Sequence, residues 1–286
     1  MSGTAEKLAA DIRSLYNVPS HAELPGSAEA AVAELLELLE RGGVRAAERD
    51  GSGVWHAVPW VKQGILVAFR VGRIVEQPGA GSFHFQDKHN LPTRRFDVTD
   101  RVRIVPGGSA VRRGAYVAPG VVCMPPMYIN VGAWVGEGSM IDSHSLVGSC
   151  AQVGAGVHLS AAAQLGGVLE PINMAPVVIE DDVIVGGNCG VYEGTIVREG
   201  AVLAAGVVLT RGTPVFDLVG ETVYKATRES PLEIPARAVV VPGSRTLSAD
   251  RSRWGAEHGL SLQTPVIVKY RDAKTDVATA LEDWLR

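Results

Sequence analysis

Side chains suited to metal or acid-base chemistry are sparse in the middle of this chain. Cys123, Cys150 and Cys189 are far apart and form no Cys-x-x-Cys pair, so neither a disulfide framework nor a cysteine-based zinc site is indicated. His144 and His158 have no third histidine near them with which to bind zinc. We therefore expect three core cysteines and no bound metal. We also expect two histidines in structural or supporting roles, although a lone histidine can act as a base.

The element that must position any site is a repeat of six residues. From Arg103 the chain reads RIVPGG SAVRRG AYVAPG VVCMPP, with an aliphatic residue or once a cysteine in third place. A period of six fits neither the 3.6 residues of a helix nor hairpins every 8 to 12 residues, but it fits a stacked solenoid. The expected inward positions are Val105, Val111, Val117, Cys123, Ile129, Val135, Ile141, Val147, Val153, Leu159, Leu165, Ile179, Val185, Val191, Val197, Leu203, Leu209 and Val215.

This repeat predicts a left-handed parallel β-helix, in which three short strands form each triangular coil of 18 residues. Gly, Asn or Asp often follows the aliphatic residue, as expected for corners that need left-handed φ values. The fold class is thus mainly β, and chance spacing of valines in a β-sandwich is the alternative. Eight extra residues near 167–176 break the period and must loop out, either as a functional flap or as a harmless insertion.

The flanking segments predict a small α/β domain over 1–102 and a C-terminal extension over 242–286. Apolar spacing indicates a helix around Leu8, Ile12 and Leu15, and another from Val32 to Leu39 with Ser27 as its N-cap. Two strands are expected in 44–58. The β-helix should occupy 103–241, with an excursion at 217–233 and a last coil over 234–241. A strand at 266–270 and a helix near 277–285 should follow.

Composition limits the class of protein. The chain has 286 residues, 33 of them glycine, and 27 basic against 31 acidic residues give a net charge of -4. That balance gives no whole-chain attraction to nucleic acid or to an anionic membrane. No apolar run approaches the roughly 20 residues of a membrane span, and no signal peptide is evident, so we expect a cytoplasmic protein.

Several segments of the repeat resemble one family. They are Arg103-Ile104-Val105-Pro106, Glu137-Gly138-Ser139-Met140-Ile141-Asp142, Val147 to Gly154 (VGSCAQVG), Val157-His158-Leu159-Ser160 and Gly166 to Pro171 (GGVLEP). The sequence resembles the tetrahydrodipicolinate N-succinyltransferases of the hexapeptide-repeat acyltransferase superfamily. The resemblance implies succinyl transfer from succinyl-CoA to the amine of a ring-opened cyclic imine dicarboxylate in the lysine pathway. It also implies a homotrimer with sites between subunits, and no permanently bound cofactor.

The resemblance also suggests substrate-binding and catalytic residues. Asp142 lies in the family's Met-Ile-Asp motif and becomes the candidate for acid-base work or for holding the substrate amine, although a corner also favours Asp for backbone reasons alone. Arg103 could hold a substrate carboxylate through two hydrogen bonds, or could be a solvated surface residue. Ser160 and Gly167, within the shared motifs, are further candidates for substrate binding.

The family's second carboxylate is missing from its expected place. Gly190 occupies that position, and the nearest acid is Glu193. Glu193 could take over the catalytic role from a displaced position, serve another role, or be solvated.

Small residues 18 apart suggest a path for the CoA arm. Ala161, Gly187 and Ala205 stack at one corner once the eight inserted residues are removed from the count. Arg198, Arg211 and Lys225 are candidates for the CoA phosphates or the succinyl carboxylate, although each could be a surface charge. Residue spacing does not measure acyl-chain length, so an acetyltransferase remains an alternative, as does a non-catalytic scaffold.

Overall fold

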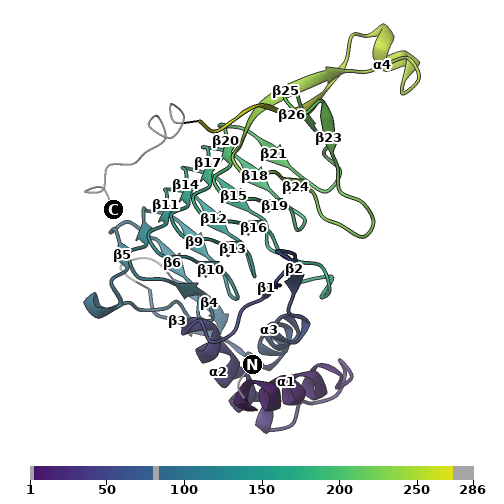
Figure 1. The fold of residues 1–286 in the computed structure, drawn as a ribbon. Helices are drawn as coiled ribbons and strands as arrows, with labels where there is room; N and C mark the ends of the chain where they lie inside the picture. The colour runs from purple at the N-terminus through teal and green to yellow at the C-terminus, as the bar shows by residue number, and fades with distance from the viewer. Residues whose placement is uncertain (1–2, 80–83, 273–286) are drawn as a thin grey trace.

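The computed structural model describes residues 3–79 and 84–272. Helices lie at the N-terminal end of a prism of parallel β-strands, and a β-arm projects from the other end (Figure 1). Within these residues, no helix is long and apolar enough to cross a membrane.

The two helices expected from apolar spacing are present. Helix α1 (Gly3–Tyr16) and helix α2 (Ser27–Glu40) bury those apolar stripes against each other and against α3 (Pro59–Val71). The prediction of Ser27 as N-cap is wrong. Gly26 is the cap, because the turn already begins with the Ala28 amide donating to the Pro25 carbonyl.

Two antiparallel hairpins complete the N-terminal part. Strands β1 (Ala47–Arg49) and β2 (Trp55–Ala57) pair as the sequence predicts, and β3 (Ile74–Gln77) pairs with β4 (Phe85–Lys88). A 3-10 turn, η1 (Val98–Asp100), leads into the repeat.

The repeat forms a prism with three sides, each a parallel sheet. The first side contains β5 (Arg103–Ile104), β8 (Val122–Cys123), β11 (Met140–Ile141), β14 (His158–Leu159), β17 (Ile184–Val185) and β20 (Val202–Leu203). The second contains β6 (Ala110–Val111), β9 (Tyr128–Ile129), β12 (Leu146–Val147), β15 (Gln164–Leu165), β18 (Gly190–Val191) and β21 (Val208–Leu209). The third contains β7 (Tyr116–Val117), β10 (Trp134–Val135), β13 (Gln152–Val153), β16 (Val178–Ile179), β19 (Ile196–Val197) and β24 (Glu233–Ile234).

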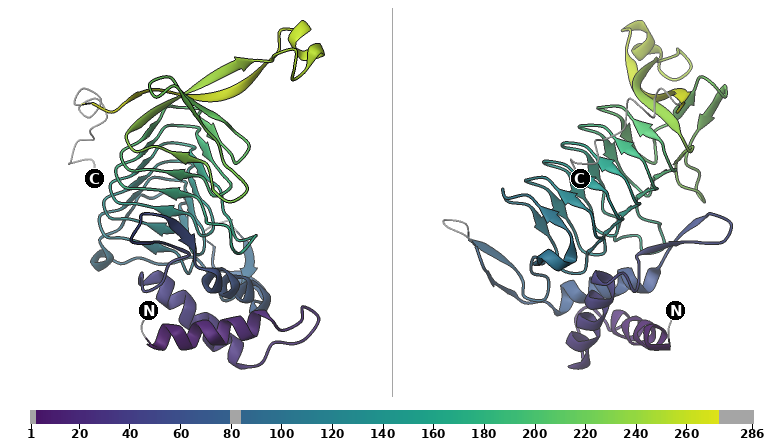
Figure 2. Two further views of the ribbon diagram at one scale, coloured as in Figure 1. Left: turned by 45° about the vertical axis from the view of Figure 1, so that its right-hand side comes forward. Right: turned by 60° about the vertical axis from the view of Figure 1, so that its left-hand side comes forward.

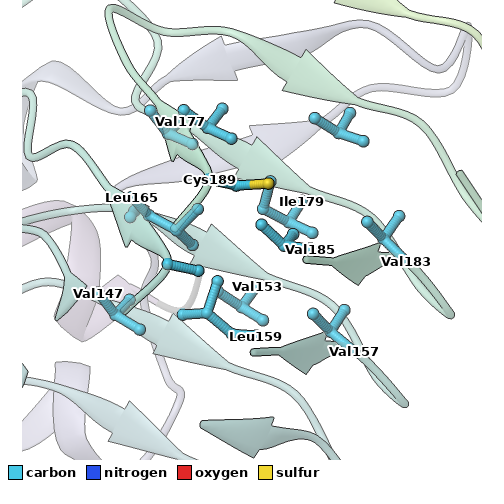
Figure 3. Close-up of a cluster of buried hydrophobic side chains, with 14 of the residues drawn as sticks. Val147, Val153, Val157, Leu159, Leu165, Val177, Ile179, Val183, Val185 and Cys189 are labelled. Atoms are coloured by element: carbon cyan, nitrogen blue, oxygen red, sulfur yellow. The ribbon is translucent and has the colours of Figure 1, made fainter. Parts of the chain in front are cut away.

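Register and burial confirm the repeat. Val135 pairs with Val153, 18 residues on, whereas Val153 pairs with Ile179, because the eight extra residues loop out between β15 and β16. The aliphatic side chains of successive coils point into the prism and pack on one another (Figure 3). Stacking is what gives each coil its core, since one coil alone cannot bury its apolar residues.

The corners explain the glycine content. We call the corner between the first and second sides the first edge, that between the second and third sides the second edge, and the remaining corner the third edge. On the third edge, Gly138, Gly156, Asp182 and Gly200 stack in one column, and all have left-handed φ values between 56° and 67°. Glycine takes such a conformation without steric cost, and Asp tolerates it better than most residues.

The strand register departs from the six-residue count at both ends of the repeat. Arg103 and Ile104 pair with Val122 and Cys123, so Ile104, although 36% exposed, takes the place in the strand register assigned to Val105. An extra residue in the following turn, which contains Gly107 and Gly108 with φ of 143° and 92°, causes the shift. At the other end, Val215 is buried in the core of the prism as expected, but the strand that pairs with β19 is Glu233–Ile234.

The C-terminal part starts from the last coil, which the sequence predicts over 234–241. Two pairings confirm this coil: β24 pairs with β19, and β25 (Ala238–Thr246) pairs with β20. Strand β25 then runs out as an antiparallel pair with β26 (Ser261–Tyr270), which contains the strand expected at 266–270. The short helix α4 (Arg253–Glu257) lies at the tip of this arm (Figure 2). Strands β22 (Val215–Asp217) and β23 (Thr222–Tyr224) form the excursion, and the helix expected near 277–285 lies outside the described residues.

The N-terminal helices pack on the second edge. Val131 and Cys150, both on that edge, belong to the helices' hydrophobic cluster rather than to the core of the prism. All three cysteines are buried and free, as expected.

Candidate active site on two edges of the prism

The first edge holds Asp142, Ser160, Gly187 and Ala205. Asp142 and Ser160 are neighbours in successive coils, because the Asp142 amide donates to the carbonyl of Leu159. Gly187 stacks on Ala161, and a Cβ added to Gly187 would lie 3.3 Å from the Ala161 carbonyl oxygen. The expected column of small residues is therefore present on the edge that carries Asp142.

The left-handed turn of the corner does not account for Asp142. At this corner the left-handed residue is His144, with φ of 61°, so Asp142 is not needed for the conformation that favours Asp at corners. Its Oδ1 accepts a hydrogen bond of 2.7 Å from the Ser143 amide, and its side chain is 30% exposed. The other carboxylate oxygen, Oδ2, lies 3.8 Å from Nε2 of His158. Asp142 is thus a half-buried carboxylate beside an imidazole, a pairing suited to proton transfer.

Arg103 lies on the same side as His158, three strands away. Neighbouring strands are about 4.8 Å apart, so some 10 Å separate Arg103 from the β11 coil that ends in Asp142. One dicarboxylate could span much of that distance. His144 is exposed at the corner, and no group of three or more metal-ligating side chains occurs within residues 3–79 and 84–272.

The second edge holds Gly167 and Glu193 in neighbouring coils. They line a pocket of about 590 Å³ between the inserted loop, 166–177, and the corner residues of the two coils above. Oε2 of Glu193 accepts a 2.8 Å hydrogen bond from the backbone amide of Arg211. The inserted loop is therefore the wall of a pocket and not only a bulge in the repeat.

The side chain of Tyr192 explains why position 190 holds a glycine and not an acidic residue. A Cβ on Gly190 would lie 2.5 Å from a ring carbon of Tyr192 and 2.9 Å from its hydroxyl oxygen. The aromatic ring occupies the space that a larger side chain at 190 would need. Two acidic residues line this pocket instead, Glu193 on the same corner as Tyr192 and Glu170 in the inserted loop.

A basic pocket adjoins this edge. Arg211, Lys225, Arg245 and Arg251 line a cavity of about 280 Å³ to which none of the described acidic residues contributes. Nε of Arg245 is buried without a hydrogen-bond partner among the described residues. Such a cluster of cations is suited to a phosphate or another polyanion.

Arg198 is not available for an anion. Its guanidinium donates to Glu233 at 2.7 Å and to Glu180 at 2.9 Å, so it joins the third side to the carboxylates beside it. The expectation that Arg198 contacts CoA is therefore replaced by a structural role.

The structure thus divides the candidate residues between two edges of one prism. Asp142, Ser160, Gly187 and Ala205 share the first edge, whereas Gly167, Glu193 and Lys225 lie on or beside the second. Sequence reasoning missed Tyr192, Arg245 and Arg251. Tyr192 could have been found from the strand register, because the register places it next to Gly166 of the preceding coil. The two arginines come from the distant C-terminal arm, and no periodic signal points to them.

These features define a hexapeptide-repeat protein of the acyltransferase type. Two family models match the chain, one described as tetrahydrodipicolinate N-succinyltransferase N-terminal over residues 7–71 and one as the hexapeptide repeat of succinyl-transferase over 176–211. The chain belongs to the family of 2,3,4,5-tetrahydropyridine-2,6-dicarboxylate N-succinyltransferases. It is 40% identical to the protein of that name from Delftia acidovorans over 274 residues, and 41% identical to the one from Azoarcus sp. over 274 residues, covering 93% of each chain in both comparisons.

Proposed function

We propose that this protein transfers the succinyl group of succinyl-CoA to the amine of ring-opened tetrahydrodipicolinate, in lysine and diaminopimelate biosynthesis. Its identity of 40% to a named N-succinyltransferase over nearly the whole chain carries the proposal. The Asp142 corner supports it independently, because it presents a half-buried carboxylate on an edge lined with small residues.

In the proposed reaction, the amine nitrogen attacks the thioester carbonyl and a C–N bond forms. Asp142 accepts the proton that the nitrogen loses, the C–S bond breaks, and the CoA thiolate is protonated as it leaves. Arg103 holds a carboxylate of the acceptor, with Ser160 and Gly167 contributing to its binding site. Glu193, on the second edge, serves as the second acid-base group.

The basic pocket is proposed as the phosphate site for succinyl-CoA. Lys225, Arg245 and Arg251 face one cavity with Arg211, and four cations match the charge of the nucleotide end of CoA. The CoA arm then runs along an edge with little side-chain bulk, past Gly187 and Ala205. Succinyl-CoA is a cosubstrate in this scheme and not a permanently bound cofactor.

Assembly accounts for the division of the residues. Asp142 and Glu193 lie on different edges of one prism, so we propose a homotrimer in which the first edge of one copy faces the second edge of the next. A left-handed coil, the domain limits at 102 and 241, and a cytoplasmic location likewise remain predictions.

The test is release of the CoA thiol. Purified protein is incubated with the cyclic dicarboxylate and either succinyl-CoA or acetyl-CoA, and thiol is measured with and without the acceptor. We expect acceptor-dependent release with succinyl-CoA well above that with acetyl-CoA. Faster release with acetyl-CoA would indicate an acetyltransferase. No acceptor-dependent release with either thioester would favour the non-catalytic scaffold.

A further inference from the structure

Lys62, in the first turn of helix α3, is a fully buried lysine. Its side chain is 0% exposed, and Nζ donates a hydrogen bond of 2.5 Å to the carbonyl of Met174 in the inserted loop. Burial lowers the pKa of this ammonium. Among the described residues, no carboxylate forms an ion pair with it. Burying an amine costs free energy unless the amine is hydrogen-bonded, and the Met174 carbonyl in the loop provides that hydrogen bond.

The position of Lys62 on α3 explains its reach. Ile65, one turn further along the same face, packs onto the second edge, where a Cβ added to Gly132 would lie 2.7 Å from its Cδ1. Helix α3 therefore lies against the lower coils of this edge. Lys62 extends from it to the loop that leaves the edge after β15.

The loop in turn lies on the corner that carries Glu193. A Cβ added to Gly194 would lie 2.6 Å from the Ala175 carbonyl oxygen and 3.5 Å from Cγ of Met174, so the loop is in close contact with that corner. At the loop's start, the Val168 amide donates to the Ser149 carbonyl at 3.2 Å. Lys62 is thus the anchor of the far end of the loop, the part in contact with the Glu193 corner.

We propose that Lys62 is a positioning residue that holds loop 166–177 against the Glu193 corner and thereby sets the affinity of this pocket for the acceptor. The inference rests on the proposed function for its kinetic consequence. Its structural consequence, the order of the loop, can be measured without any activity.

The experiment compares Lys62→Met, which keeps the length but removes the donor, with Lys62→Arg, which keeps a donor. Lys88→Met is the matched control, because Nζ of Lys88 also donates to a backbone carbonyl, that of Gly72, at 2.7 Å. Hydrogen exchange of the peptide spanning 168–175, KM and kcat are measured on the full-length proteins. If Lys62→Met does not fold, Lys62→Gln replaces it, since its shorter side chain does not reach Met174.

We expect Lys62→Met to speed loop exchange by about 10-fold or more, the usual effect of losing a hydrogen bond from a charged donor. KM for the acceptor should rise by a similar factor, with kcat changed less, as expected for lost binding that is common to ground and transition states. Lys62→Arg should recover most of both, and Lys88→Met should change neither.

Unchanged exchange and KM in Lys62→Met, as expected for the control, would overturn the inference. Absence of succinyl transfer in the unmodified protein would instead overturn the proposed function. The exchange comparison would still decide whether Lys62 orders the loop.

Discussion

At the residue scale, the proposed chemistry depends on where carboxylates lie on the corners. Asp142 sits at a corner whose left-handed conformation is supplied by His144, so that conformation does not require an aspartate at position 142. It has instead the Ser143 amide on one oxygen and His158 near the other. These neighbours hold the carboxylate in one orientation, which an acid-base group requires.

Asp142→Asn should lower kcat by roughly 10²-fold or more, because the amide keeps the shape but accepts no proton. The melting temperature and the solution mass should be unchanged. Asp182→Asn is the control, because Asp182 is also a corner carboxylate but lies on the third edge, and we expect wild-type turnover from it. A fully active Asp142→Asn enzyme would remove Asp142 from the mechanism.

The cysteines should be unreactive in the folded protein. Burial raises the pKa of Cys123 and of Cys150 to about 12, and it also raises that of Cys189. A thiol reagent at pH 8 should therefore label none of them until denaturant is added.

The same shifts give a direction for stability against pH. Unfolded thiols ionise near pH 8.5, whereas the folded ones stay protonated until about pH 12, so the unfolded state loses protons first. The free energy of unfolding should fall as the pH rises from about 8.5 toward 12. Replacing Cys123 with Ala should reduce that slope in a denaturant titration, and an identical slope would contradict the assignment.

At the element scale, most of the prism could be predicted because one aliphatic residue recurs at every sixth position of the sequence. The inward aliphatic positions, the looped-out eight residues and the last coil all follow from counting in sixes. The ends could not be predicted this way. The turn with Gly107 and Gly108 adds one residue and shifts Val105 out of place, and Val215, although buried, does not pair beside β19, where Ile234 from after the excursion lies instead.

The site was predictable only where it follows the period. Asp142, Ser160 and Gly187 come together because they occupy equivalent corners. Contacts between the prism and the flanking parts, such as Lys62 with Met174 or Arg245 in the basic pocket, join residues far apart in sequence and leave no periodic signal.

Coil stacking predicts the cost of a core truncation. Leu159 is fully buried between Ile141 and Val185 in the coils on either side. Leu159→Ala should lower the free energy of unfolding by about 2–5 kcal/mol, measured by denaturant titration. Gln164→Ala, at an exposed outward position of the same coil, should change it by less than about 0.5 kcal/mol. Equal effects of the two changes would contradict the inward assignment.

At the scale of the whole molecule, one prism carries the two halves of the proposed site on different edges. The carboxylate of Asp142 lies on the first edge, whereas Glu193, the inserted loop and the basic pocket lie along the second. One side of the prism separates the two edges. The proposed mechanism uses both carboxylates, so it needs a second copy of the chain, and the proposed trimer would form three equivalent sites between neighbours.

A site shared between subunits can be tested by complementation between two variants that are each expected to be inactive. Asp142→Asn and Glu193→Gln proteins are each assayed alone, then unfolded together in equal amounts, refolded and assayed again for thiol release. If each site takes Asp142 from one copy and Glu193 from the next, random mixing leaves about one site in four with both carboxylates. We predict that the mixture recovers about a quarter of wild-type activity, whereas a mixture no more active than its parents would contradict a site shared between subunits.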